Sequence, residues 1–239
     1  MDAMRSELPR VLAAVLAVGA LACGRGNAPE QTIDQAVEGR LTQGEAIAPV
    51  IVCLGDSLTA GLGLLTNQAY PHVLDEMFAA EGYQEVEMVN AGVSGDTSAG
   101  GLRRVEALLG PSVAALVLAL GGNDALRGIS SSETYDNLAG IIELADAEGI
   151  PVMLAGMEAP PNLGPDYQEA FREVFLRLAR DYRDVVVWVP FLLEGVAGQP
   201  ALNQADGIHP NEQGARIVAG LLYPKLRTII DQLPPPVGQ

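Results

Sequence analysis

The 239-residue sequence is poor in cysteine and in basic side chains, and both shortages narrow the range of functions. It has two cysteines, and because Cys53 falls in a predicted buried strand, no disulfide between Cys23 and Cys53 is expected. Only 14 lysines and arginines stand against 30 acidic residues, and the net charge of -16 argues against binding to nucleic acid or anionic membrane surfaces. No apolar run reaches the roughly 20 residues that a bilayer-spanning helix needs.

Two well-known motifs are also absent. The glycine-rich stretch at 91–101 is not followed by Gly-Lys-Ser/Thr, so it is not a Walker phosphate loop. Ser57 lacks the second glycine of the Gly-x-Ser-x-Gly elbow, which disfavours an ordinary α/β-hydrolase fold.

The N-terminal region has the features of an export signal. Arg5 and Arg10 precede a twelve-residue apolar run, and a small-x-small cleavage pattern ends just before Cys23. We therefore predict a signal peptide at 1–22, a tether at 23–48, a catalytic domain at 49–231 and a short tail at 232–239. The protein is expected to be exported. The sequence leaves open whether Cys23 is lipidated, which would attach the protein to a bacterial membrane, or whether simple cleavage releases it into the periplasm.

Strand and helix patterns alternate along the domain. Short apolar runs bounded by turn-forming residues predict buried strands, and apolar residues three or four positions apart predict helices. Five strand-then-helix units predict a parallel sheet with helices on both faces, a three-layer α/β/α fold of flavodoxin-like type, with 113–120 as its central strand. The predicted strands are 50–54, 86–91, 113–120, 150–155 and 185–189, and the predicted helices are 68–82, 101–109, 134–148, 166–180 (capped by Asp166) and 212–230. A loop is expected at 58–67 and a turn at 121–124.

Four candidate residues follow the ends of predicted strands, where ligands bind in open α/β sheets. Ser57 is a candidate nucleophile, the backbone N–H of Gly95 and the side chain of Asn123 are candidate oxyanion donors, and His209 is a candidate base. Asp206 lies three residues before His209 and could orient its ring. Taken alone, Ser57 and Asn123 are more typical of an ordinary turn or cap, and His209 fits a loop or a base equally well. Because all four are expected on one edge of the sheet, together they favour a catalytic site.

The same stretches resemble the four signature blocks of the SGNH, or GDSL, hydrolase superfamily. They are GDSLTAG at 55–61, NAGVSGDTSAGG at 90–101, GGNDALRG at 121–128 and DGIHP at 206–210. Within the superfamily, GMEAPPNLG at 156–164 and NQADGIHPNEQG at 203–214 are similar to the bacterial arylesterases and the multifunctional thioesterase/lysophospholipase enzymes.

The resemblance implies roles for these residues. Ser57, Asp206 and His209 would form a catalytic triad, and the backbone N–H groups of Ser57 and Gly95 would join the Asn123 side chain as oxyanion donors. It also implies neither metal nor organic cofactor. Asp56 and Asp124 are expected to hold their loops.

The expected activity is that of a serine esterase acting through an acyl-enzyme on aryl, short- or medium-chain acyl, thioester or lysophospholipid substrates. Export and the acidic charge favour neutral or lipid-like esters over acyl-CoA. A carbohydrate deacetylase and a catalytically silent binding module of the same fold are the alternatives. Apolar residues in the loops are candidates for acyl contact: Leu62, Leu126, Ile129, Met157 and Leu163.

Overall fold

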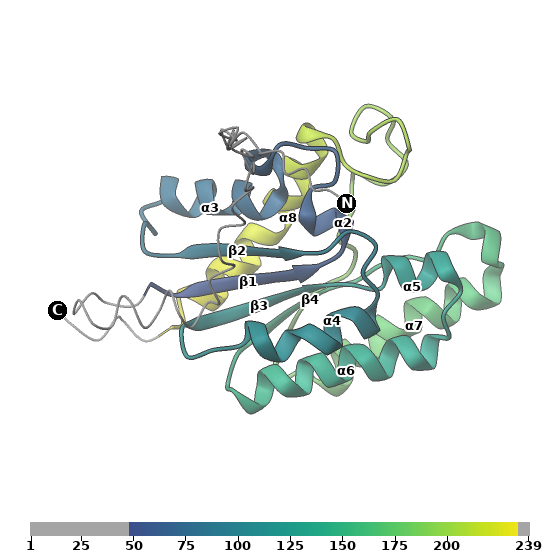
Figure 1. Ribbon diagram of the computed structural model, residues 1–239, viewed down its shortest axis with the longest axis horizontal. Coiled ribbons are helices and arrows are strands. Elements are labelled where there is room, and N and C mark those ends of the chain that lie inside the picture. Colours follow the sequence, from purple (N-terminus) through teal and green to yellow (C-terminus); the bar gives the residue numbers. More distant parts are fainter. Residues whose placement is uncertain (1–47, 234–239) are drawn as a thin grey trace, which may run out of the picture. The chain divides into compact units, whose positions relative to one another are not determined.

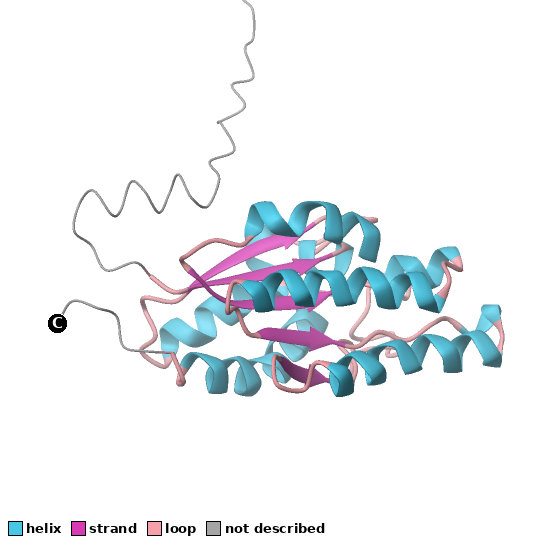
Figure 2. Cartoon of the chain, turned by 90° about the horizontal axis from the view of Figure 1, so that it is seen from below, coloured by secondary structure: helices cyan, strands magenta, loops and turns pink. Residues whose placement is uncertain are grey.

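A computed structural model describes residues 48–233, which form a five-stranded parallel sheet between two layers of helices (Figure 1). The strand order is β2-β1-β3-β4-β5 with every pair parallel, and in Figure 2 the strand arrows point the same way. This order confirms the predicted three-layer α/β/α fold with β3 at its centre. The strands are β1 (Val50–Gly55), β2 (Glu87–Gly92), β3 (Val113–Ala119), β4 (Val152–Ala155) and β5 (Val186–Val189).

The helices cover the two faces of the sheet unequally. The helices α3 and α8 pack against each other on one face, whereas α4, α6 and α7 lie side by side on the other (Figure 1). The helices are α2 (Ser57–Ala60), α3 (Tyr70–Ala80), α4 (Ser98–Val105), α5 (Gly122–Arg127), α6 (Ser131–Ala147), α7 (Pro165–Asp181) and α8 (Glu212–Ile230).

Covering the sheet on both sides explains the apolar strand sequences. Every residue of β1 is buried, and β3 is buried apart from one position. Cys53 lies inside β1 with no exposed surface, and burial raises the pKa of its thiol to about 12. It therefore serves as a small core residue, as the sequence predicted.

The sheet has a topological switch point beside β1, and this point determines where the candidate active site lies. From β1 the chain first adds β2 on one side and then β3 on the other. The connections that leave the carboxyl ends of β1 and β3 therefore diverge, and open α/β sheets bind their ligands at such a point. Ser57 follows β1 and Asn123 follows β3, so both lie at this point of the sheet edge.

Three local predictions are wrong. The expected loop at 58–67 contains the last three residues of α2 and the start of a 3₁₀ turn at Thr66–Gln68, and the expected turn at 121–124 contains the start of α5. One or two turns of helix are too short to show an apolar period. Asp166 does not cap α7, because that helix begins one residue earlier at Pro165 and Gly164 occupies the capping position. Proline fits the first position of a helix, where no N–H is needed.

The predicted signal peptide, Cys23 and nearly all of the predicted tether and tail lie outside the described residues. Export and lipidation therefore stay predictions. Within 48–233, no helix has both the length and the apolar character needed to cross a membrane.

Candidate active site

Three side chains from two distant parts of the sequence form a hydrogen-bonded row. Ser57 Oγ lies 2.8 Å from His209 Nε2, although 152 positions separate the two residues. On the other side of the imidazole ring, His209 Nδ1 lies 2.7 Å from Asp206 Oδ2. Ser57 and His209 are half-buried, whereas the Asp206 side chain is 45% exposed. This arrangement can pass the hydroxyl proton to the ring and balance the resulting positive charge with a carboxylate.

Asp206 is held in place by its own loop. Its Oδ1 accepts hydrogen bonds from the backbone N–H groups of His209 at 3.0 Å and Ile208 at 2.9 Å. These two bonds, followed by the bond from the His209 ring, lower the pKa of Asp206 to about 2. The carboxylate is therefore ionised at neutral pH, with Oδ1 bound to the backbone and Oδ2 facing the ring.

Gln204 links the histidine loop to the segment that follows the serine. Its Nε2 donates to the carbonyls of Leu62 at 2.7 Å and Pro210 at 3.0 Å, while its backbone N–H donates to the carbonyl of His209 at 2.8 Å. The neighbouring Asn203 is buried and donates to the Val196 carbonyl at 2.7 Å. These bonds fix the histidine relative to the serine without regular secondary structure.

The segments that follow β1, β2 and β3 each carry a candidate hydrogen-bond donor. The Ser57 N–H is in the first turn of α2, where backbone N–H groups have no acceptor within the helix. The Gly95 N–H has no backbone acceptor within residues 48–233, and Gly95 has a φ of +83°, which favours glycine. Asn123 is in the first turn of α5 and is half-buried. Three loops thus bring donors to the carboxyl ends of β1, β2 and β3.

Asp56 is a buried carboxyl group next to the serine, with 2% of its surface exposed. Its Oδ1 accepts from the Leu58 N–H at 3.0 Å, which caps α2, and its Oδ2 accepts from Asn123 Nδ2 at 3.2 Å. Burial raises the pKa of Asp56 from 3.8 to about 6, although these two hydrogen bonds oppose the change.

The raised pKa of Asp56 predicts a pH-dependent stability. The folded state binds the proton more tightly than the unfolded state, so the stabilisation is complete below about pH 4 and is lost as the pH rises through about 6. A tenfold change in proton affinity corresponds to about 1.4 kcal/mol, so the loss amounts to about 3 kcal/mol. Between pH 4 and 7.5, Asp56→Asn should therefore gain about 2–3 kcal/mol of unfolding free energy relative to wild type in urea titrations. A difference that does not change with pH would contradict this. Asp184→Asn, at a 91% exposed side chain, controls for loss of a surface charge.

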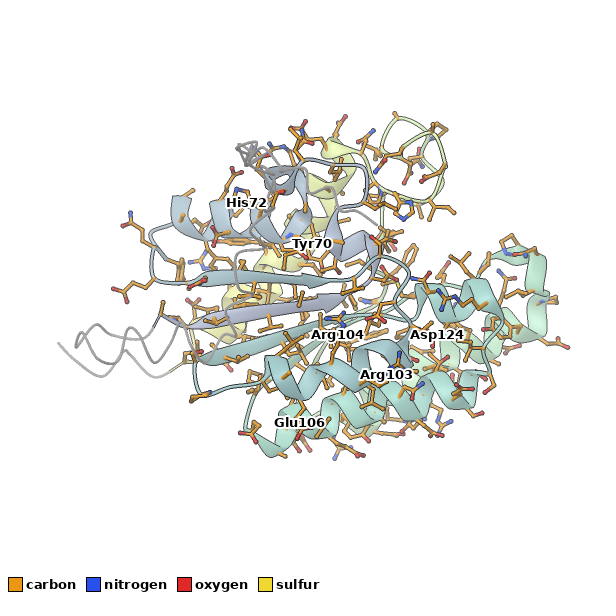
Figure 3. All side chains as sticks on the ribbon, in the orientation of Figure 1. Tyr70, His72, Arg103, Arg104, Glu106 and Asp124 are labelled. Atoms are coloured by element: carbon orange, nitrogen blue, oxygen red, sulfur yellow. The ribbon has the colours of Figure 1, made fainter. Side chains whose placement is uncertain are left out.

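Arg104 connects the ends of the first two strands (Figure 3). Its guanidinium group donates to the carbonyls of Gly55 at 3.0 Å and Ala91 at 2.8 Å, and to Asp96 Oδ2 at 2.8 Å. The Arg104 and Asp96 side chains are 26% and 13% exposed. One side chain of α4 therefore holds the residue before Asp56, the end of β2 and the residue after Gly95.

Replacing Arg104 should destabilise the fold. Arg104→Gln leaves the Asp96 carboxylate and two carbonyl groups without their charged donor, and we expect the free energy of unfolding to fall by about 2–3 kcal/mol. Arg103→Gln is the matched control, because the neighbouring Arg103 is exposed and its replacement should cost less than about 0.5 kcal/mol. Urea unfolding curves measure both changes. Equal losses for the two variants would contradict the role given to Arg104.

Two further side chains hold the donor loops. Arg127 Nη2 donates to the Gly95 carbonyl at 2.7 Å, which connects α5 to the loop after β2. Asp124 is fully buried and accepts from the Ser98 N–H at 2.8 Å, from the Ser98 hydroxyl and from the Thr134 hydroxyl at 3.4 Å. Asp56 and Asp124 both hold loops, as the sequence predicted.

A small apolar cavity of about 10 Å³, room for about one water molecule, lies beside Ser57 and His209. Leu62 lines it together with Leu58, Leu64, Leu192 and Leu193. The other four residues predicted to contact the acyl group do not line this cavity. Leu126 is exposed, Met157 is buried, and Ile129 and Leu163 are half-buried.

Three residues that hold the site were not predicted from the sequence: Gln204, Arg104 and Arg127. The sequence gives little indication of them, because each donates to backbone carbonyl groups, which any residue type could supply. The second histidine, His72, lies on α3 (Figure 3), where its side chain is exposed and 3.8 Å from Glu76.

Comparison with known proteins places the chain among the hydrolases of carboxylic esters. The sequence profile of the GDSL-like Lipase/Acylhydrolase family matches residues 53–217. The chain belongs to this family, which confirms the resemblance to the SGNH hydrolases.

Named relatives carry the same class of activity. The chain is 44% identical over 191 residues to Esterase TesA of Pseudomonas aeruginosa, covering 80% of this chain and 93% of the relative. It is 35% identical over 192 residues to Thioesterase 1/protease 1/lysophospholipase L1 of Escherichia coli, covering 80% and 89%. A crystal structure of TesA superimposes with a TM-score of 0.71 at 43% identity, covering 75% of this chain and 99% of that structure.

Proposed function

We propose that the protein is a serine esterase in which Ser57, His209 and Asp206 form the catalytic triad. The observation that carries this proposal is the 2.8 Å contact between Ser57 Oγ and His209 Nε2. Ser57 Oγ attacks the carbonyl carbon of the ester and gives its proton to Nε2. Asp206 keeps the Nδ1 proton in place and stabilises the charged ring.

The reaction proceeds through an acyl-enzyme. When the tetrahedral intermediate collapses, the bond from the carbonyl carbon to the leaving oxygen or sulfur breaks, and the leaving group takes the proton from Nε2. Water then attacks the acyl group, gives a proton to Nε2, and the free acid leaves as that proton returns to Ser57. The N–H groups of Ser57 and Gly95 and the Asn123 side chain bind the oxyanion in both tetrahedral states.

For the substrate we propose neutral or lipid-like esters. The names of the relatives include esterase, thioesterase and lysophospholipase. The net charge of -16 disfavours polyanionic leaving groups such as coenzyme A. The exposed Leu62 is the predicted acyl contact that also lines the cavity beside Ser57.

Labelling and an activity panel test these proposals. A fluorophosphonate probe should label the folded protein at Ser57, and Ser132→Ala, at an exposed serine on α6, should label normally. Absence of labelling in folded wild-type protein would rule out the serine esterase and favour a silent binding module. Hydrolysis of p-nitrophenyl esters of increasing chain length should exceed hydrolysis of acetylated sugars, and the reverse order would indicate a carbohydrate deacetylase.

A further inference from the structure

Asp56 is a buried acid for which the triad mechanism has no use, yet it contacts the predicted oxyanion site. It immediately precedes Ser57, and its Oδ2 accepts a hydrogen bond from Asn123 Nδ2 at 3.2 Å. Its other oxygen is occupied by the Leu58 N–H. Because both oxygens have donors and the side chain is 2% exposed, its position leaves it little freedom to turn.

The amide group of Asn123 has two orientations of nearly equal shape. In one, Nδ2 faces Asp56 and the site, and in the other the carbonyl oxygen Oδ1 takes that place. Only the first orientation can bind an oxyanion, because the second would present an acceptor to a negative charge. A carboxylate accepts hydrogen bonds but cannot donate them, so Asp56 is compatible with the first orientation alone.

We propose that Asp56 is a positioning residue that fixes the amide orientation of Asn123 and thereby keeps an N–H group directed at the oxyanion. This inference rests on the proposed function, in which Asn123 is an oxyanion donor. Nδ2 carries two hydrogens, one for Asp56 and one for the substrate, so a single amide can serve both partners. The role differs from that of Asp206, which acts on the base.

The isosteric change Asp56→Asn should reverse the amide orientation of Asn123. The new side chain has one acceptor, which the Leu58 N–H retains, so its amide N–H₂ faces Asn123. In this variant the Asn123 carbonyl oxygen turns toward the new amide group at position 56. An acceptor then replaces the donor at the oxyanion position. Loss of one oxyanion donor typically lowers kcat by about 10²- to 10³-fold, so we expect a loss of this size with KM within about threefold of wild type.

A double-mutant cycle with Asn123→Ala, assayed at pH 8 where Asp56 is ionised, tests the proposal. Asn123→Ala alone should lower kcat by a similar factor. In that background Asp56→Asn should change kcat by less than about threefold, because the amide on which Asp56 acts is gone. If the two losses multiply instead, Asp56 acts independently of Asn123 and the proposal is wrong. An increase in kcat for Asp56→Asn would also overturn it, since removing a negative charge near the oxyanion would then dominate.

Asp56→Ser separates orientation from helix capping. Serine is a good N-cap and can still accept from the Leu58 N–H, but it is too short to hold Asn123. We expect kcat to fall by at least about tenfold with normal folding by circular dichroism. An unchanged kcat would overturn the proposal even if Asp56→Asn failed to fold. Failure of the serine esterase itself is distinguishable, because it would appear as wild-type protein that takes no fluorophosphonate label.

Discussion

Ser57→Ala is expected to lower kcat for p-nitrophenyl butyrate by at least about 10⁴-fold and to abolish the burst of p-nitrophenol. Alanine cannot form the acyl-enzyme, and the remaining rate would come from the oxyanion donors and substrate binding alone. Single-turnover and steady-state assays measure both effects.

The fold should survive this substitution. The Ser57 hydroxyl bonds to His209 at a half-buried position, and the backbone N–H and the cap of α2 stay intact. The unfolding free energy of Ser57→Ala should therefore stay within about 1 kcal/mol of wild type. A variant that remains folded and retains more than a hundredth of wild-type kcat would show that Ser57 is not the nucleophile.

Asp206→Asn is expected to lower kcat by about 10³- to 10⁴-fold while leaving the loop folded. Asparagine can keep Oδ1 as the acceptor for the Ile208 and His209 N–H groups, so its amide nitrogen takes the place of Oδ2. Facing a donor, His209 Nδ1 must become an acceptor, which moves the ring proton to Nε2. A protonated Nε2 cannot take the proton of Ser57, so the base is lost without a change in shape.

The position of the proton on the His209 ring can be measured directly. Asp206→Asn should keep KM within about threefold and show the Nε2–H tautomer by ¹⁵N NMR of the histidine ring. Asp206→Ala is the comparison, because it also removes the loop bonds and should lower stability as well as kcat. Near-normal turnover of Asp206→Asn would mean that another group orients His209.

The elements that the sequence predicted best are those with long, regular apolar patterns. The predicted helix at 212–230 coincides with α8, and each predicted strand overlaps an observed one. The short helices α2 and α5 were missed, because four and six residues are too few to show a period.

For the candidate site, the chemistry was easier to predict than the scaffold. Ser57, Gly95, Asn123 and His209 could each be placed after a strand, and the parallel topology then brings those strand ends to one edge. The bonds of Arg104 could not be predicted. These bonds join the guanidinium group to residues 55, 91 and 96, which lie close together only after β1 and β2 have paired.

The 152-residue separation between Ser57 and His209 has a consequence for biosynthesis. The ribosome produces Ser57 early, but the imidazole and the helix that follows it emerge only when the domain is almost finished. In the proposed mechanism, the nascent chain until then holds an unactivated alcohol and does not cleave esters. In that mechanism, hydrolytic competence therefore depends on the contact that brings His209 to Ser57.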